Sequence, residues 1–180
     1  MDARLHHLQG KTELVSDLLP LLQDFYRERL DAFQQHQASA RQIGQYDINN
    51  TYQYVISREE TQLSWVAAAI TQLGGTPPEV SATRDDRRAA GRAIDRAAAA
   101  RTAIEEDARE AQAFVDRWRP RVDSLANARD AKMLRVILGE ALEHKRFFDQ
   151  ALAGRTDLLG RRGRVLGPSH GEVLPTRWIE

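Results

Sequence analysis

An internal repeat constrains the fold of this 180-residue chain more than any other feature. An offset of 82 positions carries Val55 onto Ile137 and Ile70 onto Leu152, so that one pair of helical patterns aligns with a second pair. The two helices of the first pair are separated only by a short joint at Gly44. Helices joined so closely pack antiparallel. The chain is therefore predicted to contain two similar helical hairpins.

Apolar residues recur at helical spacing in four segments, and no segment shows the alternation of a strand. The predicted helices begin at 16–17, 47–50 and 85–86 and after a turn at 124–127, and they end near Ile43, at Leu73, at Pro120, which kinks or ends its helix, and at Gly154. The connector at 74–84 is rich in glycine and proline, and at about 3.4 Å per extended residue it could cross a bundle from end to end. The predicted fold is an all-α, antiparallel four-helix bundle made of two hairpins joined by a long crossover. We assign residues 1–15 to a lead-in, 16–154 to the bundle and 155–180 to an irregular C-terminal tail.

The composition narrows the class of protein. The chain has 26 basic and 26 acidic residues, so we expect no nucleic-acid partner. It has no cysteine, which excludes disulfides and thiolate metal sites. The first residues lack the apolar run of a signal peptide, and no segment has the roughly 20 apolar residues of a membrane span. We therefore expect a cytoplasmic protein that does not bind membranes.

Polar residues interrupt the apolar faces at matched places in the two hairpins. Glu59 and Gln62 share a helix face with Tyr52, Val55 and Val66, and Glu28 falls on the stripe of Phe25 and Ala32. The offset of 82 carries Glu28 onto Glu110, Glu59 onto Ala141 and Gln62 onto His144. A polar group on a buried face costs several kcal/mol unless it has a partner. These positions therefore indicate either a buried polar site or a surface that binds a partner.

The stretches that begin at Glu59-Glu60-Thr61-Gln62 and at Glu143-His144 resemble the second and fourth helices of the ferritin-like superfamily, which includes rubrerythrins and bacterioferritins. The resemblance covers residues 16–154 and implies a metal site with the ligands Glu28, Glu59, Gln62, Glu110 and His144. Two positions depart from the family: Gln62 replaces a histidine, and Ala141 replaces a metal-bridging glutamate. Glu140 and Glu143 are possible stand-ins for the missing carboxylate. The resemblance implies iron or manganese, with one ion favoured over two, or no metal at all.

Several alternatives remain open at the level of sequence. If the chain is an enzyme, the resemblance implies a metal-dependent oxidoreductase. Without a metal, the same groups would form a hydrogen-bonded network that an arginine could neutralise; Arg58, Arg109 and Arg135 lie on suitable helices. The chain would then be a non-enzymatic interaction or structural module, or would bind a small molecule in its core. We expect a homodimer by analogy with the family, a possible protein partner at the C-terminal tail, and an exposed His36.

Overall fold

The chain folds into α-helices connected by short turns and one longer segment. The structure is a computed structural model that describes residues 3–79 and 93–160, with side chains described from position 18 in the first range and from position 96 in the second. Within these ranges it consists of α1 (Ala3–Gln42), α2 (Tyr46–Gln72), α3 (Ala93–Asp123) and α4 (Ala128–Leu152), with no strand. The all-α architecture predicted from the sequence is confirmed.

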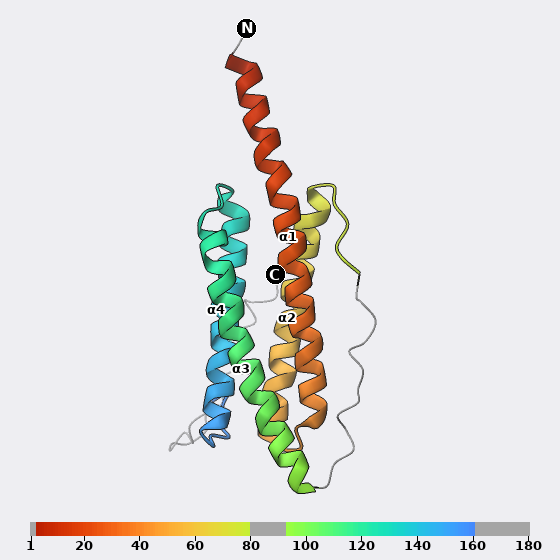
Figure 1. Cartoon of the computed structure of the whole chain (residues 1–180), viewed down its shortest axis with the longest axis vertical. Helices are drawn as coiled ribbons and strands as arrows, with labels where there is room; N and C mark the ends of the chain where they lie inside the picture. Colours follow the sequence, from red (N-terminus) through yellow and green to blue (C-terminus); the bar gives the residue numbers. More distant parts are fainter. Residues whose placement is uncertain (1–2, 80–92, 161–180) are drawn as a thin grey trace, which may run out of the picture.

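The helices pack as two hairpins laid against each other. Helix α1 contacts α2, and α3 contacts α4; the hairpins then meet through contacts of α1 with α3 and of α2 with α4. Neighbouring helices run antiparallel, and α2 ends at the opposite end of the bundle from the start of α3 (Figure 1). The chain must therefore cross the length of the bundle between its hairpins, as predicted.

The helix ends follow local chemistry. The Asn127 side chain caps α4 by accepting hydrogen bonds from the backbone N–H groups of Arg129 and Asp130 at 3.1 and 3.2 Å. Gly74 and Gly154 follow α2 and α4 with φ angles of 77° and 80°, which glycine adopts without strain. The predicted ends of the second and fourth helices are confirmed.

The predicted start of the first helix is wrong. Helix α1 begins at Ala3 rather than at 16–17, and its first turns extend beyond the ends of the other helices (Figure 1). The lead-in contains three leucines together with alanine, arginine, glutamine, lysine and glutamate, all of which favour helix, and the exposed Pro20 does not interrupt α1. Helix α3 likewise continues past Pro120 to Asp123. The predicted start of the third helix at 85–86 and most of the C-terminal tail lie outside the described residues.

The interior contains two apolar clusters along the length of the bundle. The first surrounds Phe25 and Trp118, whose ring centroids lie 4.9 Å apart, and the second surrounds Tyr52 and Phe148, at 5.1 Å. Buried polar side chains lie between them. No helix in the described parts of the chain is both long and apolar enough to cross a membrane.

Candidate functional site

A cluster of buried polar side chains occupies the centre of the bundle. All four helices contribute to it, and every member is less than a tenth exposed. The members are Arg29, His36 and Ser39 from α1, Tyr52, Glu59 and Gln62 from α2, Asp107 from α3, and His144 from α4. We call these residues the polar cluster.

Glu59 is the centre of the polar cluster and is fully buried. Its Oε1 atom lies 2.8 Å from His36 Nδ1, within hydrogen-bond distance, and 3.0 Å from Arg29 Nη2. The nearest nitrogen of His144, Nδ1, is 3.9 Å from the same oxygen, which is too far for a hydrogen bond. The Glu59 carboxylate is therefore paired with Arg29 and His36 of α1. His144 of α4 lies near the carboxylate but does not form a hydrogen bond with it.

Arg29 contacts both polar residues of the α2 motif. Its Nε donates a hydrogen bond to Gln62 Oε1 at 2.9 Å, and its Nη2 forms the ion pair with Glu59 without hydrogen-bond geometry. The guanidinium carbon lies 5.5 Å from the centroid of the Phe114 ring, within the range of a cation–π contact. The side chain is 2 % exposed, so this positive charge is held inside the protein.

Gln62 uses both ends of its amide. While its oxygen accepts from Arg29, its Nε2 donates to Glu140 Oε2. Glu140 also accepts hydrogen bonds from Arg58, one of them from Nε at 3.2 Å. Gln62 is therefore a hydrogen-bond bridge between Arg29 and an ion pair at the α2–α4 boundary.

Asp107 and Tyr52 form a second contact of the polar cluster. The Tyr52 hydroxyl donates to Asp107 Oδ2 at 2.6 Å, and the Tyr52 ring packs against His36 and Phe148 with centroid distances of 6.1 and 5.1 Å. Burial, followed by the charge of the Asp107 carboxylate, raises the pKa of Tyr52. The phenol therefore remains a hydrogen-bond donor at neutral pH.

The two histidines of the polar cluster differ in charge. Burial acts to lower the pKa of His36, but the charge and hydrogen bond of Glu59 outweigh it and raise the pKa above its usual value. Burial and the nearby Arg29 charge lower the pKa of His144 to about 3. His36 thus favours the imidazolium form, while His144 is neutral, with both ring nitrogens buried and without a hydrogen-bond partner among the described residues.

The charges of the polar cluster cancel without an added ion. Burial opposes ionisation of Glu59, but the charges of His36 and Arg29 outweigh it and hold the pKa of Glu59 below its usual value. Counted by formal charge, with His36 as imidazolium, Arg29 and His36 contribute two positive charges, and the side chains of Glu59 and Asp107 contribute two negative charges. A buried charge is tolerated when it is paired in this way. The polar cluster is therefore electrically neutral as it stands.

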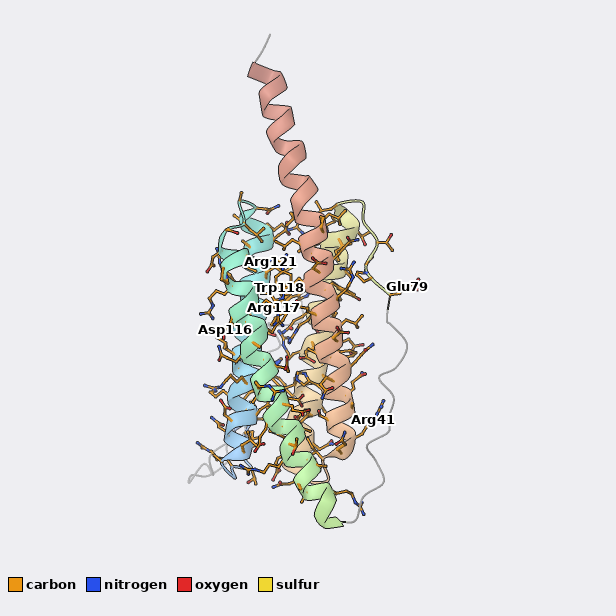
Figure 2. The ribbon with its side chains drawn as sticks, in the orientation of Figure 1. Arg41, Glu79, Asp116, Arg117, Trp118 and Arg121 are labelled. Carbon is orange, nitrogen blue, oxygen red and sulfur yellow. The ribbon has the colours of Figure 1, made fainter. Side chains whose placement is uncertain are left out.

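The structure does not bring Glu28 and Glu110 into the polar cluster, and the prediction that they point into the bundle is wrong. The Glu28 carboxylate accepts hydrogen bonds from Trp118 Nε1 at 2.8 Å and from Arg117 Nε at 3.0 Å, on the side of α3 that passes α1 (Figure 2). The Glu110 side chain is 62 % exposed and lies 3.5 Å from Arg109. Both residues are one position away from the buried stripe of their helix, so the rotation of the helix turns them outward.

The stand-in carboxylates are also engaged elsewhere. Glu143 is partly exposed and lies 3.7 Å from Arg146, and Glu140 is held by Arg58 and Gln62. Ala141 is buried in the apolar core. No group of three histidine or acidic side chains with metal-binding geometry occurs among the described residues. With an arginine between the remaining donors, the residues present do not fit a di-metal centre.

Sequence reasoning missed four members of the polar cluster. His36 was expected to be exposed but is 4 % exposed, and Arg29, Ser39 and Asp107 were not singled out. A signal was present, because Leu18, Leu22, Phe25, Arg29, His36 and Ala40 follow a regular three-and-four-residue spacing. The arginines suggested for neutralisation lie elsewhere: Arg58 at Glu140, Arg109 at Glu110, and Arg135 at Asp123, 3.0 Å away.

No protein-family model matches the chain, and no curated protein matches it in sequence. Two solved structures resemble it. A bacterioferritin from Desulfovibrio desulfuricans, described with a di-iron site, is similar with a TM-score of 0.63 and 15 % identity over 78 % of this chain and 81 % of that chain. A protein from Xanthomonas campestris pv. campestris is similar with a TM-score of 0.55 and 17 % identity over 79 % of this chain and 92 % of that one. At these identities the likeness shows the fold alone: the chain is a ferritin-like four-helix bundle.

Proposed function

We propose that this protein is a metal-independent ferritin-like bundle that serves as a structural or interaction module rather than as a di-iron oxidoreductase. One observation carries the proposal: Arg29 lies between Glu59 and Gln62, where its guanidinium forms an ion pair and a hydrogen bond. The polar cluster is then neutral without a metal ion. A bundle neutralised by its own side chains does not depend on iron for its folded state.

Electrostatic repulsion supports the same proposal. Two unit charges 4 Å apart interact by about 4 kcal/mol at the effective dielectric constant of protein sites, so a divalent ion near a fixed guanidinium is repelled by roughly twice that. The ion would also have to break the Arg29 contacts with Glu59 and Gln62. Binding at this place is therefore opposed both by the charge of Arg29 and by the loss of its ion pair with Glu59 and its hydrogen bond to Gln62.

The alternative function is a mononuclear iron or manganese site. Two observations favour it: His144 has two free ring nitrogens, and Glu59 Oε2 has no hydrogen-bond partner among the described residues. A carboxylate and a neutral imidazole are suitable ligands for these metals. For this function Arg29 would have to turn away from Glu59, and the bundle could then act as a metal-dependent oxidoreductase.

Elemental analysis of the full chain, purified without chelators, separates the two functions. We expect iron, manganese and zinc well below one ion per chain, and a melting temperature that EDTA does not change. A ligand that binds only the folded state raises its stability, so a bound metal would be detected as a loss of melting temperature on chelation. About one equivalent of metal per chain, or such a loss, would contradict the proposal.

For the interaction role, we propose a homodimer and a protein partner that binds the C-terminal tail, where Val173-Leu174 and Trp178-Ile179 are apolar pairs. The bundle itself also has an exposed aromatic side chain, because Tyr46 is 81 % exposed. Tyr46 lies near the end of the bundle at which Leu158, Ile43 and Ile48 belong to one apolar cluster. Light scattering tests the dimer in the full chain. Comparing the full chain with one that ends at Gly160 tests the tail: we expect unchanged helix content and loss of partner binding only.

A further inference from the structure

We propose that Arg29 is a resident cation that closes a latent divalent-cation site between Glu59 and His144, and that replacing it with a carboxylate opens this site. The inference rests on the proposed metal-independent function, because a chain that already holds a metal here would have no closed site. The ligand class is a borderline divalent ion that accepts carboxylate and imidazole donors, such as Co²⁺, Mn²⁺ or Fe²⁺.

The side chains of Glu59 and His144 converge. Glu59 Oε1 lies 3.9 Å from His144 Nδ1, and these atoms belong to α2 and α4 on facing sides of the bundle. Metal–ligand distances of about 2.0–2.2 Å place two donor atoms of one ion roughly 3–3.5 Å apart. A small side-chain rotation therefore suffices for both residues to reach the same ion.

The donors are free. His144 is 1 % exposed, and neither of its ring nitrogens has a hydrogen-bond partner among the described side chains. The same is true of Glu59 Oε2. Buried polar atoms without partners are rare in folded proteins and call for an explanation. These atoms are the ones that a metal ion would use.

A single side chain blocks the site. Arg29 Nη2 lies 3.0 Å from Glu59 Oε1, so its positive charge lies beside the carboxylate that an ion would have to bind. Arg29→Glu removes one positive charge and adds one negative charge, which changes the formal charge of the polar cluster from zero to minus two. A divalent ion returns that charge to zero, and the new carboxylate supplies a third donor beside Glu59 and His144.

The test is a titration of the full chain with Co²⁺, followed by its visible absorption and by calorimetry. We expect Arg29→Glu to bind about one equivalent at least tenfold more tightly than the unmodified chain, and Arg29→Glu combined with His144→Ala to lose this gain. Arg27→Glu is the matched control, because Arg27 lies on the same helix but is exposed and pairs with Asp24. It should bind Co²⁺ no better than the unmodified chain.

A second variant and a second measurement keep the inference testable if Arg29→Glu does not fold. Arg29→Gln removes only the charge, and we expect Co²⁺ to raise its melting temperature but not that of the unmodified chain. In the unmodified chain, NMR should show slow solvent exchange of the Arg29 Nε–H relative to Arg27. Rapid exchange there, or no gain of Co²⁺ binding or stability in any folded Arg29 variant, overturns the inference.

These outcomes separate the two proposals. If the unmodified chain binds no metal and the Arg29 variants gain none, the metal-independent function stands and the latent site is refuted. If the unmodified chain already binds Co²⁺ as tightly as Arg29→Glu, both are refuted, because Arg29 then neither closes the site nor replaces the ion.

Discussion

The two hairpins of the bundle share their helical spacing but differ in their buried polar groups. The α1–α2 hairpin contributes Arg29, His36, Glu59 and Gln62 among others, whereas the α3–α4 hairpin contributes only Asp107 and His144 to the polar cluster. At the positions equivalent to Arg29 and Glu59, the second hairpin has the buried alanines Ala111 and Ala141. The charge pairs centred on Glu59 are thus formed within the first hairpin, and the second hairpin mainly supplies apolar packing.

This difference explains why His144 has no hydrogen-bond partner in the described part of the chain. Gln62, its equivalent on α2, is hydrogen-bonded to Arg29, but α3 carries no arginine at the matching place. Where α2 meets α4, the repeat instead places opposite charges at equivalent positions. Arg58 of the first hairpin and Glu140 of the second form an ion pair there. A duplicated bundle that binds two metals needs similar donors in both halves. The two hairpins of this chain carry different buried polar groups, which is consistent with side-chain charges that neutralise one another without a metal ion.

The largest expected effect comes from the first hairpin. Glu59→Gln removes the carboxylate that pairs with both Arg29 and His36, and it leaves two buried positive groups without an anion. Removal of one partner from a buried ion pair typically costs about 3–5 kcal/mol. We expect the free energy of unfolding in urea to fall by an amount in this range.

Glu60→Gln is the matched control for that measurement, since Glu60 is the next residue of α2 and is exposed. Surface substitutions usually change stability by no more than about 0.5 kcal/mol. If the two variants lost the same stability, Glu59 would not be the centre of a buried network, and the contrast between the hairpins would disappear.

The next effect tests the second hairpin through pH. Because the pKa of His144 is lowered to about 3 in the folded state, the unfolded chain binds more protons between that pH and about 6.5. Stability is therefore lost as the pH falls below 6.5, by up to about 2–3 kcal/mol between pH 6.5 and 4.5. We expect this loss to be smaller in His144→Phe.

The chosen pH range separates His144 from its charged neighbours. Glu59 has a lowered pKa, so its stabilising effect is lost mainly below pH 4.5, whereas His36 has a raised pKa, and its effect is complete below pH 6.5 and lost at higher pH. Urea unfolding of both chains at pH 6.5 and 4.5 provides the measurement. Equal losses in the two chains would show that His144 is not buried in its neutral form.

A smaller effect is expected where the two hairpins share a hydrogen bond. Tyr52→Phe deletes the hydroxyl that donates to Asp107 Oδ2 and leaves a second buried oxygen of that carboxylate unpaired. An unsatisfied buried acceptor costs about 1–3 kcal/mol. Tyr54→Phe, on the exposed side of the same helix, should leave the midpoint of thermal unfolding unchanged. A comparable loss in both variants would argue against the Tyr52–Asp107 contact.

The fold could be predicted from the sequence because it depends on features that recur many times. Several positions in the sequence support each of these features, which are the helical spacing, the glycines after α2 and α4, and the offset of 82. The apolar faces also carried polar residues that prove to be buried: Glu59, Gln62 and His144 are all inside, and Glu59 and His144 approach each other to 3.9 Å. Each of these rests on a pattern longer than one helical turn.

The remaining site could not be predicted because a shift of one residue turns a side chain by about 100° around a helix. Glu28 and Arg29 are neighbours in sequence, and Glu28 was favoured as the inward residue because it lies on the stripe of Phe25 and Ala32 and aligns with Glu110. The same one-residue error placed Glu110 inside, where its neighbour Ala111 is the buried residue; the buried carboxylate of α3 is Asp107, three positions earlier. Which of two adjacent polar residues is buried depends on partners from other helices, and the sequence of one helix does not contain them.

The smallest expected effects test this assignment directly. Glu28→Ala removes the carboxylate that accepts a hydrogen bond from the fully buried Trp118, and we expect a loss of about 1 kcal/mol in the free energy of unfolding. Glu110→Ala is the equivalent change in the second hairpin, but this side chain is largely exposed, so we expect a change within about 0.5 kcal/mol. Urea unfolding of both variants under the same conditions measures the two changes in the free energy of unfolding. A loss for Glu110→Ala as large as that for Glu28→Ala would mean that α3 is rotated from its present position, and Glu110 would again be a candidate ligand facing His144.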